Sequence, residues 1–463
     1  MLLKQQRSCL AVTSVSLVAN LTRSVCRPSS CSPKDRYRDG SRDMSEEILD
    51  TELSNLVLKA SEEVYRLLQH SRKDIDRVFL IQHAMAEKNS IAAALKSSLL
   101  TNSAFGRLQN GWVSTPNMGI LIQDHVIPTI LLSVCLEGGN VDDAIAGIRG
   151  FAKQGESAPE FHAALVGVSL SVELVLSDSV SIVPWTSLPE AEREHFETSF
   201  ASIASRPMRV RLEPSAAVVR VKLPSRRVLF ASHDDAAQED RKMGQAEVEA
   251  AMQTALDIVR CCVIFTGRPV AVLCTWLKLS DIWADRMSPK GYSYTDAIFD
   301  LSLSGEDTDI TLSEVPILFR ALQKHALRDK DALRLSTDRL GMCLRRPGLV
   351  DKSIELGIAL ECVILNELDS QGELSYRIAM RGAAYLGESA IERREIFSHL
   401  RTVYSLRSKA VHTGSLSLKP ATNASAVEAL RIGTELAGRI LRKVLLAAKF
   451  PEWESYIFGV ETS

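Results

Sequence analysis

Residues 400–414, LRTVYSLRSKAVHTG, decide how the C-terminal part of this chain is interpreted. Apolar side chains recur there close to every 3.6 residues, the period of one helical face: Leu400, Val403, Leu406, Ala410 and Val411. Gly414 follows this run and is free to take the left-handed conformation that ends many helices. The stretch therefore predicts a helix that stops at Thr413 and Gly414.

Arg407 and His412 are the candidate catalytic residues of this helix. In a last turn, the negative end of the helix dipole favours a protonated imidazole. Such an imidazole near a guanidinium suits a phosphodiester better than a carbonyl. Five positions along one helix separate the two side chains by roughly 140° and some 7.5 Å along the axis. We therefore expect a second copy of the chain to complete a site around one phosphate.

Two further helical blocks precede this helix, IALE at residues 358–361 and LSYRIAMR at residues 374–381. The three blocks together resemble the HEPN superfamily, and within it the ApeA-like branch, which has Y-x-x-R-S-x-x-x-H as its third block. The residues matching that pattern are Tyr404, Arg407, Ser408 and His412. The resemblance covers about residues 332–450 and departs at Thr413, since a glycine often follows the histidine directly.

The resemblance implies an RNA endonuclease that uses no metal and no cofactor, working as a homodimer through its C-terminal bundle. In that family the ribose 2′-OH attacks the neighbouring phosphate, the histidine moves the proton and the arginine stabilises negative charge. ApeA-like proteins are associated with bacterial defence against phage, which implies an effector regulated by the N-terminal region. The alternative is a HEPN module that binds RNA or nucleotide, or only dimerises, with Arg407 a surface arginine and His412 a capping histidine.

Four further residues are candidates for supporting roles. Glu361 lies in an otherwise apolar helix, and a buried carboxylate needs a partner. We expect Arg381 or Arg407 to pair with it across the bundle and so to orient the motif helix. Ser408 is a candidate phosphate contact, although such serines often bond their own helix instead, and Tyr404 belongs to the matching pattern.

The composition is that of an ordinary globular protein, with 463 residues and a formal net charge of −2. An RNA contact must therefore come from a local patch. The nine cysteines are scattered without a C-x-x-C pair, which favours reduced thiols in the cytoplasm over metal binding. The chain also carries no metal-site histidine motif, phosphate-binding loop or membrane-spanning apolar run.

The chain divides into five predicted parts. Residues 1–43 are basic and rich in serine and cysteine, and we expect either a disordered leader or a start codon assigned upstream of Met44. Residues 44–154 are predicted to be mainly helical, residues 155–330 to be an α+β region, residues 331–450 to be an all-α HEPN-like bundle and residues 451–463 to be a tail. The predicted fold class is thus a multidomain chain with a mixed N-terminal region and a helical C-terminal bundle.

Within the first 330 residues, one helix is expected at residues 74–99 and strands at 165–176, 179–184, 208–212 and 217–223, with 228–231 as an edge. Residues 234–243 are polar and predict a loop, and residues 312–330 predict one helix. A separate enzyme in the α+β region is the third hypothesis, ranked last because no cluster of titratable residues emerges there.

Overall fold

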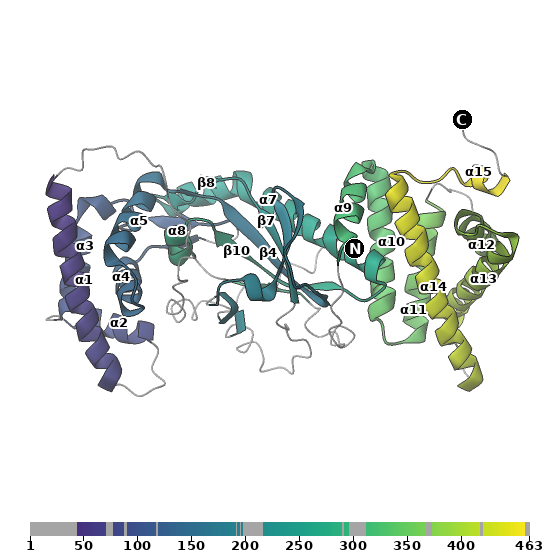
Figure 1. Ribbon diagram of the computed structural model, residues 1–463, viewed down its shortest axis with the longest axis horizontal. Helices are drawn as coiled ribbons and strands as arrows, with labels where there is room; N and C mark the ends of the chain where they lie inside the picture. The colour runs from purple at the N-terminus through teal and green to yellow at the C-terminus, as the bar shows by residue number, and fades with distance from the viewer. Residues whose placement is uncertain are drawn as a thin grey trace.

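The structure is a computed structural model, and it describes residues 44–70, 77–87, 90–116, 119–190, 192–194, 196–197, 216–288, 291–295, 312–366, 373–416 and 420–458. Figure 1 shows helices at both ends of an elongated molecule and a β-sheet between them. The fold is therefore a mixed α/β N-terminal region followed by a helical C-terminal region. The predictions for residues 1–43 and 208–212 lie outside the described residues.

The N-terminal helices pack around a core of their own. They are α1 (Met44–His70), α2 (Arg77–Ala86), α3 (Ile91–Thr101), the short 3-10 turn η1 (Ser103–Phe105), α4 (Val126–Leu136) and α5 (Val141–Gln154). The single helix expected at residues 74–99 is wrong, because Ser90 begins a new helix. Its hydroxyl accepts a hydrogen bond from the Ala93 amide at 2.9 Å, as N-cap serines do.

A six-stranded antiparallel sheet forms the middle of the molecule, in the order β11-β10-β4-β7-β6-β5. Its strands are β4 (Pro159–Ser169), β5 (Leu174–Ser177), β6 (Val180–Pro184), β7 (Ala216–Lys222), β10 (Ala271–Leu279) and β11 (Ser293–Tyr294). The strand expected at residues 165–176 is thus the end of β4, a turn and then β5. Long-range pairing of β4 with both β7 and β10 builds the centre of the sheet.

Smaller sheets join the N-terminal helices to this central sheet. They contain β1 (Trp112–Ser114), β2 (Gly119–Leu121), β3 (Glu156–Ser157), β8 (Arg226–Arg227) and β9 (Leu229–Phe230). The edge strand expected at residues 228–231 is β9, but it pairs with β1 and not with the central sheet. The short helix α8 (Ile282–Met287) packs against α5. The N-terminal core therefore extends beyond residue 154.

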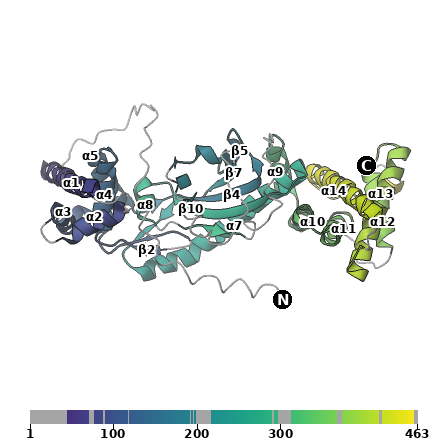
Figure 2. The same ribbon diagram turned by 90° about the horizontal axis from the view of Figure 1, so that it is seen from below.

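The helix α7 (His233–Thr266) runs along one face of the central sheet (Figure 2). It includes residues 234–243, so the predicted loop is wrong: the Ser232 hydroxyl caps the helix by accepting from the Asp235 amide at 3.2 Å. Those residues are polar because this first part of the helix faces solvent more than its apolar later turns do. Gly267, with φ of 62°, ends the helix in the left-handed conformation.

The C-terminal region consists of α9 (Val315–Lys324), α10 (Leu327–Arg345), α11 (Leu349–Ile364), α12 (Leu374–Leu386), α13 (Ala390–Thr413), α14 (Pro420–Ala447) and α15 (Trp453–Phe458). The helix expected at residues 312–330 is interrupted at His325. The last segment is more than a tail, because Trp453 of α15 is buried and its ring meets that of Tyr385 on α12 at 5.6 Å between centroids.

An ion network joins α7 to α10, and one hydrophobic core continues from the sheet into the bundle. The Asp257 side chain is only 2% exposed and accepts two hydrogen bonds from Arg334, at 2.9 and 2.7 Å. Arg260 also donates to Asp257, at 2.7 Å, and makes two bonds to Asp338. Burial alone would raise the pKa of Asp257, but the two arginines outweigh it and lower that pKa.

We predict that Asp257→Ala lowers the free energy of unfolding by about 3–5 kcal/mol, because it leaves two largely buried guanidinium groups without their shared partner. Chemical denaturation followed by circular dichroism measures this. Asp331→Ala is the matched control, since Asp331 bonds the same Arg334 at 3.3 Å but is 63% exposed. Its expected cost is below about 1 kcal/mol. Equal losses in the two variants would contradict a stabilising role for the buried carboxylate.

Candidate functional site around Arg407

Helices α11 and α13 bring Arg407, Glu361 and Tyr404 together. Arg407 Nη2 lies 3.0 Å from Glu361 Oε1, and the Tyr404 hydroxyl donates to the same oxygen at 2.7 Å. Both donors come from α13, where positions three apart share a face, and the acceptor comes from α11. One carboxylate therefore sets the direction in which Arg407 points.

Arg407 has fixed partners but remains partly exposed to solvent. The side chains of Arg407 and Glu361 are 25% and 24% exposed, so water screens the pair in part. The guanidinium also lies 5.4 Å from the centre of the Tyr404 ring, a cation–π arrangement. Burial and the bond to Glu361 raise the pKa of Tyr404 to about 12, so its hydroxyl stays protonated and keeps donating at neutral pH.

Gly357 makes room for the aliphatic stem of Arg407. A Cβ added at Gly357 would lie 2.3 Å from Arg407 Cγ and 3.0 Å from Arg407 Cβ, closer than carbon atoms can approach. Gly357 is one helical turn before Glu361 on α11. The glycine and the glutamate therefore fix the base and the tip of the same side chain. Sequence reasoning missed Gly357, whose effect depends on a contact 50 positions away.

His412 is exposed in the last turn of α13, next to the left-handed Gly414, whose φ is 62°. The predicted glycine cap is thus confirmed, in spite of the intervening Thr413. The Thr413 hydroxyl donates to the Lys409 carbonyl at 2.8 Å and so helps to close the helix end. Arg407 faces α11, whereas His412 faces solvent, so a single chain does not direct both side chains at one phosphate.

Arg381 and Ser408 lie apart from the Glu361 carboxylate interactions. Arg381 on α12 donates to the Ile364 carbonyl at 2.9 Å, and its guanidinium lies 5.5 Å from the centre of the Trp453 ring. It thereby connects three helices, and of the two arginines expected to pair with Glu361, it is Arg407 that does so. Ser408 is partly buried beside Arg407 on α13.

A second group of titratable side chains lies on the central sheet, which corrects the expectation that this region contains none. It comprises Glu160 and His162 on β4, Lys278 on β10, and Glu192. Alternation along a strand would have placed Glu160 and His162 on one face. The sequence carried no signal for Glu192 or Lys278, because they are 86 positions apart and meet only when the segment containing Glu192 packs on the sheet.

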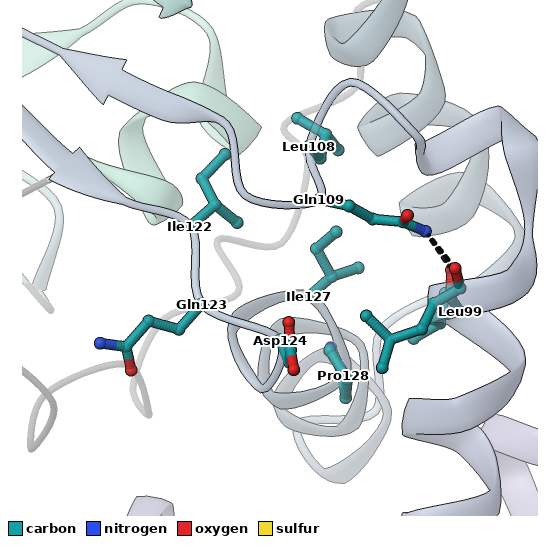
Figure 3. A pocket seen from close by; sticks show the side chains of 9 residues that line it. Leu99, Leu108, Gln109, Ile122, Gln123, Asp124, Ile127 and Pro128 are labelled. Atoms are coloured by element: carbon teal, nitrogen blue, oxygen red, sulfur yellow. Dashed lines mark hydrogen bonds between the residues drawn. The ribbon is translucent and has the colours of Figure 1, made fainter. Parts of the chain in front are cut away.

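A small pocket between α3, α4 and the loop before β1 is shown in Figure 3. The Gln109 side chain lies at the edge of the pocket and donates a hydrogen bond to the Leu99 carbonyl at 3.0 Å. The lining is otherwise mostly apolar, with Asp124 as its one charged side chain. A pocket without a basic group does not suit a phosphodiester, so it is unrelated to the chemistry expected of Arg407.

The described parts of the chain hold no group of three or more His, Cys, Asp or Glu side chains placed to bind a metal ion. Within the same ranges, no helix combines the length and the apolar character needed to cross a membrane. Comparisons with protein-family models, with curated proteins and with solved structures found no match to this chain.

We predict that Gly357→Ala lowers the free energy of unfolding by about 1–3 kcal/mol, because the new methyl group displaces the Arg407 stem. Gly438→Ala on α14 is the control: its Cβ would meet nothing within 4 Å, and alanine favours a helix over glycine by about 0.5–1 kcal/mol. Denaturant titration of both variants measures the difference. A stability gain in both would show that Arg407 does not pack on Gly357.

Proposed function

We propose that the C-terminal bundle is a HEPN-type endoribonuclease that needs no metal, with Arg407 and His412 as its catalytic residues. The observation that carries this proposal is the placement of Arg407, which is oriented by Glu361 and Tyr404 at a surface that solvent still reaches. A guanidinium whose orientation is already fixed loses little conformational entropy when it binds a phosphate oxygen. The exposed His412 supports the proposal, since a proton-transfer group must reach the substrate.

The proposed reaction is an internal transesterification of RNA. The ribose 2′-oxygen attacks the adjacent phosphorus, the bond from phosphorus to the 5′-oxygen breaks, and a 2′,3′-cyclic phosphate and a 5′-hydroxyl result. His412 takes part in moving the proton from the 2′-hydroxyl to the departing 5′-oxygen. Arg407 stabilises the negative charge that develops on the non-bridging phosphate oxygens. Ser408, next to Arg407, is a further candidate for a phosphate contact.

The active unit in this proposal is a homodimer formed through the C-terminal bundle. Its support is the separation of Arg407 and His412 around and along α13, which lets two neighbouring copies of the helix supply complementary groups. The N-terminal region regulates the bundle, and the shared core between α7, α10 and α14 provides the mechanical connection. A cytoplasmic effector in bacterial defence against phage is the role that the HEPN resemblance suggests.

A second candidate function is a HEPN module that binds RNA or nucleotide without cleaving it. The observation in its favour is the ion pair with Glu361, which already compensates the charge of Arg407. Such a module would bind RNA and lose that binding with Arg407→Ala, yet never yield cyclic phosphate ends. Binding and cleavage measured on the same RNA therefore separate the two functions.

We predict that the purified protein cleaves RNA in the presence of EDTA, and that His412→Ala and Arg407→Ala each reduce the rate by about 10²- to 10⁴-fold without unfolding the chain. Gel analysis of labelled RNA measures the rate, and circular dichroism checks the fold. His399→Ala and Arg401→Ala are matched controls on the same helix, and both should cleave like the wild type. Wild-type rates in both site variants would remove the nuclease hypothesis.

Glu361→Gln is expected to lower the cleavage rate by up to about 100-fold, because a neutral amide no longer fixes the guanidinium of Arg407. The loss should fall mainly on kcat. Glu355→Gln is the control: it makes the same change on the same helix, at a glutamate that pairs with Arg339 at 3.1 Å. If both variants lost stability equally and neither changed kcat, the orienting role of Glu361 would be wrong.

A further inference from the structure

Two adjacent strands of the central sheet present a row of polar side chains on the face opposite α7. Glu160 and His162 are two positions apart on β4, so their side chains point to the same face. Their paired residues on the neighbouring strand β10 are Lys278 and Trp276, respectively. On the far side of β4, His162 pairs in register with Arg220 of β7. His162 is only 1% exposed, so this row includes an imidazole that bulk water does not reach.

The carboxylate of Glu192 is the point on which these side chains converge. Trp276 donates its indole N–H to Glu192 Oε1 at 2.7 Å, and Lys278 Nζ lies 2.9 Å from Glu192 Oε2. His162 Nδ1 lies 3.4 Å from Glu192 Oε1. Side chains from two strands therefore fasten a residue that belongs to neither strand.

Glu192 lies within a segment that covers this face of the sheet. That segment contains the 3-10 turn η2 (Trp185–Ser187), and the buried ones among its described residues are Trp185, Leu188 and Phe196. They pack with Trp276 and Tyr292: the ring centres of Trp185 and Trp276 lie 6.4 Å apart, and those of Phe196 and Tyr292 lie 5.3 Å apart. One face of the sheet is thus covered by the long helix α7, and the other by this short segment.

The geometry around His162 favours its charged form. Nε2 lies 3.4 Å from Glu160 Oε2, and Nδ1 lies 3.4 Å from Glu192 Oε1, so each ring nitrogen faces a carboxylate oxygen. A neutral imidazole donates from one nitrogen only, and its other nitrogen would turn a lone pair toward a carboxylate. With His162 protonated, Glu160 and Glu192 face two cations, His162 and Lys278, while the neighbouring Arg220 pairs with Glu173 at 2.6 Å.

The direction of the pKa shifts agrees with this geometry. Burial by itself lowers the pKa of His162, but Glu160 and Glu192 outweigh it and raise that pKa above 6.5. Burial by itself raises the pKa of Glu192, but His162 and Lys278 lower it to about 2. Glu160 also has a lowered pKa, through its bond to His162 and the nearby charges of Arg220 and Lys278. Both carboxylates therefore stay charged where His162 titrates.

We propose that the proton on His162 fastens the covering residues 185–190, 192–194 and Phe196 to the central sheet, and that this cover loosens when the proton leaves. The contribution of His162 to stability is fully present below the ordinary pKa of about 6.5. It is lost as the pH rises through the higher pKa of the folded protein. Loosening uncovers Trp185, Phe196 and Trp276, so the sheet acquires an accessible aromatic face only when the pH exceeds the pKa of His162 in the folded protein.

Hydrogen exchange of the full chain between pH 6 and 9, corrected for the intrinsic exchange rate, tests this proposal. In the wild type, protection of peptides covering residues 185–194 should fall as the pH rises. The expected fall is about tenfold for each unit by which the pKa of His162 exceeds 6.5. In His162→Gln and Glu192→Gln the protection should be low at every pH. Glu190→Gln is the control, because Glu190 is exposed two positions before Glu192 and should behave like the wild type.

The wild-type titration decides the matter even if a variant fails to fold. Constant protection of the wild type across this range would overturn the proposal. So would a folded His162→Gln protein whose protection changes with pH as the wild type does. A fall confined to residues 185–194 and to the facing strand β10, with the C-terminal bundle unchanged, is the result that supports it.

Discussion

A single buried carboxylate, Asp257, joins the two ends of this molecule. It lies on α7, which spans about 50 Å and contacts the small N-terminal sheet, the central sheet and the bundle. A charge removed from water needs full compensation, and the guanidinium groups of Arg260 and Arg334 supply it at hydrogen-bonding distance. Because Arg334 belongs to α10, the charge can be satisfied only when the bundle is seated against α7.

The same arrangement recurs at the two other carboxylates that organise this chain. Glu361 accepts from Tyr404 and Arg407 and so links α11 to α13, and Glu192 accepts from Trp276 and Lys278 and so links a covering segment to the sheet. In each case a carboxylate on one element accepts hydrogen bonds from side chains of another element. The environments differ in exposure. Glu361 and Arg407 remain partly in contact with water, whereas Asp257 is almost completely buried.

Secondary structure was predictable wherever an apolar stripe and a strong stop signal occur together. The helices of the bundle follow this pattern, with Pro347, Gly387 and Gly414 near their ends. The predictions were wrong where a helix N-cap residue had more influence on the backbone than the composition of the stretch. Ser90 caps a second helix inside the range expected to be one helix. Ser232 caps a helix whose first residues are polar enough to suggest a loop. The order of the strands could not be predicted, because the pairing of β4 with β7 and β10 joins distant parts of the chain.

The sequence by itself determined that the chain ends in a helical region and that Arg407 and His412 lie late in one of its helices, since the 3.6-residue period and a terminal glycine are local properties. It also indicated that Glu361 needs a partner. Only the tertiary structure decided that this partner is Arg407, that Gly357 lies beneath it, and that Glu192 meets His162 and Lys278. Those contacts depend on how helices and strands pack. The free energy of a buried charge depends on side chains that lie close in space but far away in the sequence.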